Sequence, residues 1–92
     1  MSQGIRLNKL HKGTPLCIHW VDSMHTAGWI KESAFNMKDK ELEHITIGMY
    51  LKHTKKSVSC FQSCGCTKSE DKNIDAIMSI PRCAITSIQV LK

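Results

Sequence analysis

The sequence has few aromatic residues, only two prolines and no long apolar run. Aromatic residues make up 5% of its 92 residues. No stretch approaches the ~20 apolar residues that a membrane-spanning helix needs, and the N-terminus lacks the apolar run of a signal peptide. We therefore expect a protein of the cytosol in which it is made, without a membrane partner. At this length a single core and a single site are the most to expect.

Motifs of the common enzyme classes are also missing. The chain has no Gly-x-Ser-x-Gly, no glycine-rich phosphate loop and no His-Glu-x-x-His. Cysteines and histidines are present, but no pattern puts a base beside a nucleophile. We therefore predict a protein that is not an enzyme and that needs no cofactor.

The cysteines do not have the spacing of a zinc site. Cys60, Cys64 and Cys66 follow His53, but no Cys-x2-Cys pair is present. In an extended strand Cys60 and Cys64 would lie ~13 Å apart, too far to share one ion. We predict no metal site. The odd number of cysteines and a reducing cytosol favour free thiols throughout: Cys17, Cys60, Cys64, Cys66 and Cys83.

Acidic residues are fewer than basic ones. Eight Asp and Glu stand against 13 Lys and Arg, which gives a net charge of +5 and a pI of about 9.1. This balance favours anionic ligands such as nucleotides, nucleic acid or an anionic surface, without specifying one. The basic residues are spread along the chain, so a solvated surface is the other interpretation.

Alternation of apolar and polar residues predicts short β-strands. Residues 16–22 begin after Pro15, with Leu16, Ile18 and Trp20 on one face. The clearest alternation is in residues 44–53, where one face carries Ile45, Ile47, Met49 and Leu51, and the other Thr46, Gly48, Tyr50 and Lys52. Residues 57–64 should return antiparallel, with Val58, Cys60, Gln62 and Cys64 on one face. Two further strands are expected at residues 74–80, with Ile74, Ala76, Met78 and Ile80 pointing inward, and at 85–91.

The segments between these strands complete the predicted fold. Residues 30–43 are read as a long loop with at most a helical turn at 38–43, its apolar residues tacking it to the body. Residues 81–84 suit one tight 3₁₀-like turn. Residues 1–13 form a basic N-terminal extension, either an edge strand or frayed, and residues 14–92 form one domain. We predict an all-β fold, a small five-stranded SH3-like or Sm-like barrel with a long loop after the first strand.

Polar and aromatic residues around this loop are the candidate site, and each has a structural alternative. Trp20 shares a face with core residues, so it is either core or a ligand platform. Trp29 follows Gly28 on the loop and either stacks on a planar base or anchors the loop. Asp22 and Ser23 either form a local turn or recognise a base edge, ribose or phosphate. Arg82 is either a surface arginine or a phosphate clamp.

Several short motifs occur together in one order. They are Trp20-Val21-Asp22-Ser23, Gly28-Trp29, Gly48, Gln62-Ser63, Ile80-Pro81-Arg82 and a final set of Ile85, Ile88 and Leu91. In this order and spacing, over about residues 16–91, the chain resembles a widespread set of small bacteriophage proteins with an SH3-like barrel. Some members of that set are similar to anti-CBASS and anti-Thoeris sponges, which bind cyclic oligonucleotide or ADP-ribose-type immune signals without cleaving them.

This resemblance implies a function and a ligand site. The implied function is sequestration of a cyclic nucleotide-type signal. The implied ligand residues are Trp20, Asp22, Ser23, Trp29, Gln62, Ser63 and Arg82. A domain of this size offers only a shallow concavity, so we expect a homo-oligomer with sites at subunit interfaces. A nucleic-acid-binding barrel and a structural phage adaptor that binds protein are the alternatives.

Overall fold

The computed structural model describes residues 6–23, 27–36, 42–65 and 73–91. These residues form seven β-strands and three short 3₁₀ turns. The strands are β1 (Pro15–Val21), β2 (Glu43–His53), β3 (Ser57–Phe61), β4 (Ser63–Cys64), β5 (Ile74–Asp75), β6 (Met78–Pro81) and β7 (Ile85–Val90). The 3₁₀ turns are η1 (Leu7–Lys9), η2 (Glu32–Ala34) and η4 (Arg82–Ala84).

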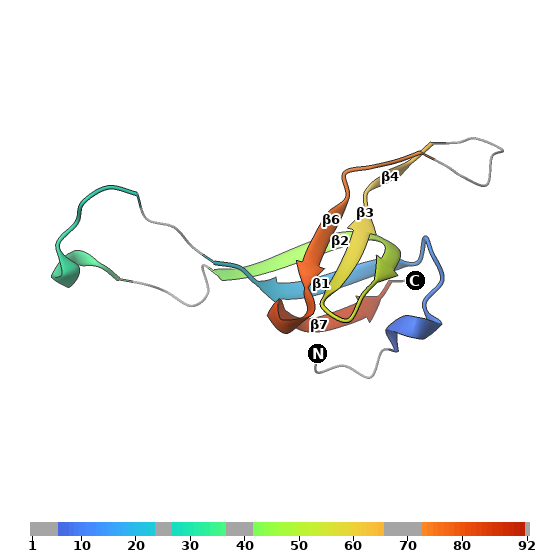
Figure 1. Ribbon diagram of the computed structural model, residues 1–92, viewed down its shortest axis with the longest axis horizontal. Coiled ribbons are helices and arrows are strands. Elements are labelled where there is room, and N and C mark those ends of the chain that lie inside the picture. Colours follow the sequence, from blue (N-terminus) through green and yellow to red (C-terminus); the bar gives the residue numbers. More distant parts are fainter. Residues whose placement is uncertain (1–5, 24–26, 37–41, 66–72, 92) are drawn as a thin grey trace.

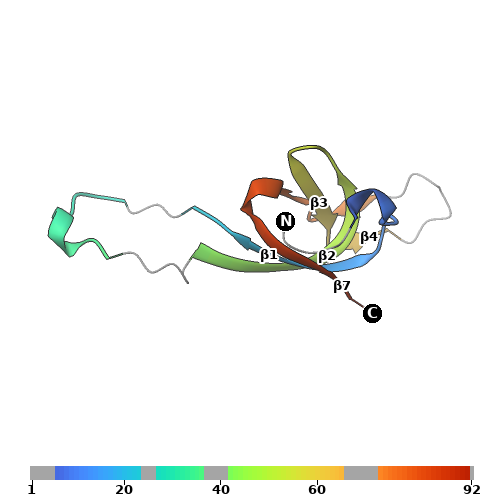
Figure 2. The same cartoon turned by 90° about the horizontal axis from the view of Figure 1, so that it is seen from below.

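Five of the strands make one antiparallel sheet in the order β6-β3-β2-β1-β7 (Figure 1). β4 and β5 pair with each other as a small second sheet. The large sheet curves, so that β3 stands over the layer formed by β1, β2 and β7 (Figure 2). The all-β fold, the long connection after the first strand and the tight 3₁₀ turn at residues 81–84 are confirmed.

The core lies on the concave side of this curved sheet. Leu16 and Ile18 of β1 are fully buried, as their predicted shared face requires. Burial of each such side chain is worth about 1.5–3 kcal/mol. Every strand of the large sheet contributes to the core, and its buried members are Leu7, Leu16, Ile18, Tyr50, Val58, Cys60, Ile80, Ile85 and Ile88.

Part of the expected N-terminal extension packs on this core. Residues 7–9 form η1 rather than a strand, Leu7 is buried, and Leu10 packs against the core. Gly13 N–H donates to the Tyr50 carbonyl at 2.7 Å, and Tyr50 N–H donates to the Thr14 carbonyl at 2.8 Å. The described residues of the extension are therefore neither an edge strand nor frayed, and residues 1–5 lie outside the described part.

The alternation predicted for β2 is correct, but its apolar face points outward. Ile45 and Ile47 are 63% and 57% exposed, whereas Gly48 and Tyr50 are buried. The register explains this, because Leu16 of β1 lies opposite Gly48. A Cβ on Gly48 would lie 3.0 Å from the Cβ of Cys60. The inner side of β2 is therefore too close to β3 for a larger residue at this position.

The predicted strands at residues 57–64 and 74–80 are each broken in two. Gln62 interrupts the first, where its N–H donates to the Asp75 carbonyl and its side-chain amide donates to the Ile47 carbonyl. Ala76 interrupts the second with a left-handed φ of 55°. Met78 is consequently 43% exposed, contrary to its expected inward position, and Ala76 is exposed as well. Ile80 is buried, as predicted.

The described middle of the long connection between β1 and β2 lies away from the sheet (Figure 1). This middle part, residues 27–36, contains η2 and is called the arm below. Trp29, Ile30 and Phe35 are all more than half exposed. The expectation that apolar residues tack this loop to the body is therefore wrong for Ile30 and Phe35, whereas Leu42 at its end is half-buried. The helical turn expected at residues 38–43 lies mostly outside the described residues.

Candidate ligand-binding cleft

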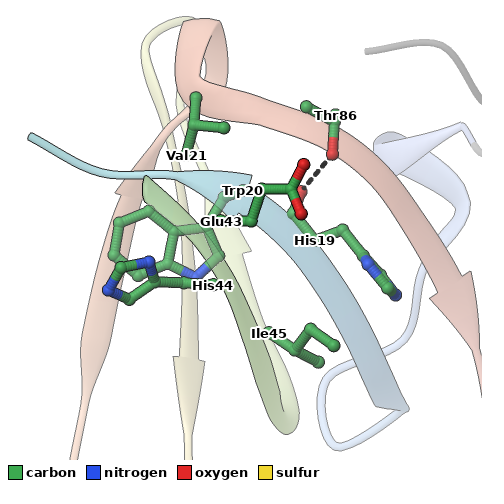
Figure 3. A pocket seen from close by; sticks show the side chains of 7 residues that line it. All are labelled: His19, Trp20, Val21, Glu43, His44, Ile45 and Thr86. Carbon is green, nitrogen blue, oxygen red and sulfur yellow. Dashed lines mark hydrogen bonds between the residues drawn. The ribbon is translucent and has the colours of Figure 1, made fainter. Parts of the chain in front are cut away.

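A cleft of about 420 Å³ lies where the arm leaves the sheet (Figure 3). It is formed by the last residues of β1, the first residues of β2 and one residue of β7. Its volume is within the range of ligand pockets in proteins, about 300–1,000 Å³, and near the lower limit. The lining residues are His19, Trp20, Val21, Glu43, His44, Ile45 and Thr86.

Strand alternation divides these residues between the two sides of the sheet. His19 pairs with Ile45 and Val21 with Glu43, so these four side chains share the outer side. Trp20 pairs with His44, and both rings therefore turn to the inner side, where Trp20 packs against the core. The outer side of the cleft thus combines a carboxylate and an imidazole with two aliphatic side chains.

Hydrogen bonds hold the framework of the cleft. Thr86 of β7 donates through Oγ1 to the carbonyl of His19 at 3.1 Å, which joins β7 to β1 where their register shifts (Figure 3). His44 Nδ1 lies 3.0 Å from the Leu42 carbonyl. Because a carbonyl oxygen only accepts, this nitrogen carries the proton and donates.

On the inner side, the Trp20 ring is fixed from two directions. Its Nε1–H donates to Thr46 Oγ1 at 2.9 Å, and its ring centroid lies 4.9 Å from that of His44 at an interplanar angle of 44°. The Thr46 hydroxyl in turn lies 3.5 Å from Met78 Sδ. These contacts are those of a core side chain, which is the structural alternative to a ligand platform that the sequence offered for Trp20.

Asp22 and Ser23 lie directly beyond the cleft. Asp22 Oδ1 accepts from the Ser23 N–H at 2.7 Å, which is the local turn foreseen as the alternative to ligand recognition. Asp22 N–H also donates to the Leu42 carbonyl at 2.8 Å, so it closes the base of the connection. Both side chains are exposed and border Val21 of the cleft.

The other predicted ligand residues lie elsewhere. Arg82 follows Pro81, which pairs with Ser57 at the start of β3, and its Nη1 donates to the Thr54 carbonyl at 3.2 Å. Gln62 comes five residues after Ser57 along the chain, a distance of roughly 16 Å in extended chain. Ser63 is exposed next to it in β4, and Trp29 is on the arm. The structure brings together Trp20, Asp22 and Ser23, but it joins neither Arg82 nor Gln62 to them.

Sequence reasoning missed most of the cleft. His19, Glu43, His44, Ile45 and Thr86 were not among the predicted ligand residues. Glu43 and His44 reach β1 by pairing across a connection of more than 20 residues, and Thr86 does so from β7. The alternation of β1 did carry one signal, since it put His19 on the face opposite the core.

Two buried titratable groups lie outside the cleft. Burial raises the pKa of the Cys60 thiol. Burial, and to a smaller extent the neighbouring Cys60, raises the pKa of Tyr50. The Tyr50 hydroxyl lies 2.6 Å from His53 Nδ1.

The described residues hold neither a candidate metal centre nor a membrane-spanning helix. No three His, Cys, Asp or Glu side chains gather as metal ligands in this part of the chain, and Cys66 lies outside it. Cys17, Cys60, Cys64 and Cys83 are free thiols. In the same residues no helix has the length and apolar character needed to cross a bilayer.

Comparison with known proteins yields no relative. No family model, no curated protein and no solved structure matches the chain. The resemblance to phage barrel proteins therefore stays a prediction from short motifs. The function has to be argued from the cleft and the distribution of charge.

Proposed function

We propose that the protein binds and sequesters a nucleotide-type immune signal, a cyclic oligonucleotide or an ADP-ribose derivative, without cleaving it, as a phage protein acting in the host cytosol. The observation that carries this proposal is the outer side of the cleft, where Glu43 and His19 stand beside Val21 and Ile45. A flat base has apolar faces and a polar edge, and this set of groups complements both.

The carboxylate of Glu43 selects for a base edge rich in donors. An ionised carboxylate only accepts, and its two oxygens match the two adjacent donors of guanine. Phosphates would be repelled by Glu43, so the base enters the cleft and the phosphates stay outside. The net charge of +5 attracts them to the protein from a distance.

The volume of the cleft limits the part of the ligand that one copy encloses. About 420 Å³ is near the lower limit for a ligand pocket. One nucleoside unit of a larger signal therefore occupies one cleft.

A closed SH3-like barrel is part of this proposal. The order β6-β3-β2-β1-β7, the long connection after β1 and the 3₁₀ turn before β7 support it. Closure would remove the edges that β6 and β7 otherwise present to solvent. In such barrels the connection after the first strand flanks the binding cleft, and the cleft here lies at the base of that connection.

Titration calorimetry with the full chain tests the proposal. The probes are cyclic di-GMP, cyclic GMP-AMP, an adenine-only cyclic trinucleotide and glycocyclic ADP-ribose. We expect saturable binding that is tighter for the guanine ligands, and mass spectrometry should recover them unchanged. Glu43→Gln should weaken guanine binding at least about 10-fold, the loss of a hydrogen bond to a charged group. Asp75→Asn, at an exposed carboxylate in β5, is the matched control and should bind normally. Failure of all four probes, or equal binding by both variants, would reject the cleft as the site.

A second function, binding of a nucleic-acid backbone, is favoured by the segregation of charge. Segments 6–21 and 44–65 carry no acidic residue and six basic ones: Arg6, Lys9, Lys12, Lys52, Lys55 and Lys56. The turn between β2 and β3 gathers two of these, and Arg82 is fastened there because its N–H donates to the Lys56 carbonyl at 2.8 Å. The turn between β2 and β3 therefore brings Lys55, Lys56 and Arg82 together.

Salt dependence separates the two functions. Each phosphate contact of a duplex lowers the slope of log affinity against log salt by about 0.9. A backbone binder should show a steep slope that Lys55→Glu with Lys56→Glu reduces and Glu43→Gln leaves unchanged. A shallow slope with short oligonucleotides would eliminate this second function.

A further inference from the structure

The exposed apolar surface of the molecule is concentrated on one segment. Of the nine large apolar side chains exposed among the described residues, six lie between residues 21 and 47, on the arm and the strand ends that carry it. Trp29 is 103% exposed, as open to water as in an unfolded chain. An indole in that position gains nothing from the fold of its own copy. The six residues are Val21, Trp29, Ile30, Phe35, Ile45 and Ile47.

The exposed side chains of the arm are of the kind that anchors protein interfaces. Trp29, Ile30 and Phe35 are 103%, 51% and 54% exposed. Aromatic residues are enriched at the centres of interfaces and carry much of the binding energy there. A partner that covers these side chains would remove their apolar surface from water.

The charge of the arm fits a second copy of the same chain. Residues 27–36 carry one lysine, Lys31, and one glutamate, Glu32, so the arm is neutral while the whole chain is +5. Two identical arms therefore meet without net repulsion. Contact between two basic bodies would be opposed.

We propose that two copies associate through antiparallel arms, so that Trp29 of each copy packs on Val21 and Ile45 at the cleft of the other. Trp29 lies eight residues beyond Val21, a reach of at most about 29 Å. In a two-fold arrangement every contact occurs twice, with the partners exchanged. If one Trp29 reaches the base of the opposite arm, the other does so as well.

This arrangement would also complete the cleft. Val21 and Ile45 form the apolar part of its outer side, and an indole laid over them closes the open side. The partner copy would thus contribute an aromatic side chain to the ligand site, and a base that enters the cleft would meet this indole at Val21 and Ile45. Burial of apolar side chains, and not a bound ligand, drives the association of the two copies. Dimerisation is therefore measured in the absence of nucleotide.

Sedimentation equilibrium of the full chain from low to high micromolar concentration tests the proposal. We expect a species of twice 10.4 kDa. Trp29→Ala should raise the dimer dissociation constant at least about 30-fold, as for a central aromatic contact. Its circular dichroism and thermal midpoint should stay unchanged. Ile77→Ser is the matched control, because Ile77 is 54% exposed but away from the arm, and it should dimerise normally.

A mixing experiment tests the reciprocal contact. Trp29→Ala and Ile45→Ser each remove both copies of the contact from their own homodimers. A mixture of the two variants restores one intact contact, between Trp29 of one chain and Ile45 of the other, and should associate more tightly than either variant alone. A monomer at every concentration, equal dimerisation by Trp29→Ala, or a mixture no tighter than its components would overturn the proposal.

Discussion

Replacement of Thr46 by valine tests whether the hydroxyl of Thr46 orients the indole of Trp20 beside the cleft. Thr46 Oγ1 is the acceptor of the Trp20 N–H at 2.9 Å. Valine has nearly the same shape and the same branching at Cβ, so packing and strand propensity are kept. The indole donor, however, loses its partner on a half-buried face of the sheet. An unsatisfied buried donor costs about 1–3 kcal/mol, and partial access of water puts this case near 1–1.5 kcal/mol.

Urea denaturation followed by tryptophan emission measures this loss in a Trp29→Phe background, where Trp20 is the single reporter. The midpoint should fall by about 0.5–1.5 M for a slope of about 1–2 kcal/mol/M, with the slope itself unchanged. Thr46→Ser is the control, because it keeps the hydroxyl and removes only a methyl group. If valine is as stable as serine, and the native emission of Trp20 is unaltered, the hydroxyl does not hold the indole and the reasoning is refuted.

Three further predictions concern the packing, pH dependence and anion binding of the body. Gly48→Ala should cost about 1–3 kcal/mol of unfolding free energy, because its Cβ would lie 3.0 Å from the Cβ of Cys60; an unchanged urea midpoint would contradict this. Burial raises the pKa values of Cys60 and Tyr50 in the folded protein. Their protonated forms therefore stabilise the fold fully at a pH below the unfolded-state pKa values, about 8.5 and 10. This stabilisation is lost as the pH rises through the higher folded-state pKa values. The thermal midpoint, measured from pH 7 upward, should therefore decrease at alkaline pH. Cys60→Ala should make the first part of this decrease less steep. An equally steep decrease in the variant would exclude the Cys60 thiol as its cause. Arg82→Ala removes the bond to the Thr54 carbonyl and should cost about 1 kcal/mol or less, with nucleotide affinity unchanged in calorimetry; weaker nucleotide binding would move the site toward Arg82.

The first strand was predictable because local signals define both of its ends. Pro15 favours an extended entry, and Asp22 with Ser23 forms the turn that follows it. Leu16 and Ile18 then point to the core by simple alternation. These signals act within a few residues, so they do not depend on contacts with the rest of the chain.

The direction of the second strand was not predictable from alternation alone. Both of its faces contain residues that a core accepts, with Ile45 and Ile47 on one side and Tyr50 on the other. Which face of β2 turns inward depends on how closely β3 approaches β2. Gly48 fits at the position where Cys60 of β3 comes within contact distance. This contact joins residues of different strands, and no local pattern records it.

The candidate site was predictable only where it lies on one strand. Trp20, Asp22 and Ser23 are consecutive or nearly so, and the structure keeps them together. Glu43 enters through pairing across the long connection. Gln62 was implied as a ligand residue only by the resemblance to phage barrel proteins; in the structure its side-chain amide donates to the Ile47 carbonyl at the break between β3 and β4.

The separation of apolar and basic surfaces reconciles self-association with a high net charge. Basic residues dominate segments 6–21 and 44–65, whereas the arm, residues 27–36, is neutral and exposes Trp29. A dimer formed through the arms would hold the two bodies apart by a distance of the order of the arm's reach, at most about 29 Å. Charges interact weakly beyond the Debye length of about 8 Å at physiological salt. Added salt should therefore leave the dimer nearly unchanged while it weakens the binding of any polyanion at the turn between β2 and β3, so one variable distinguishes the two surfaces.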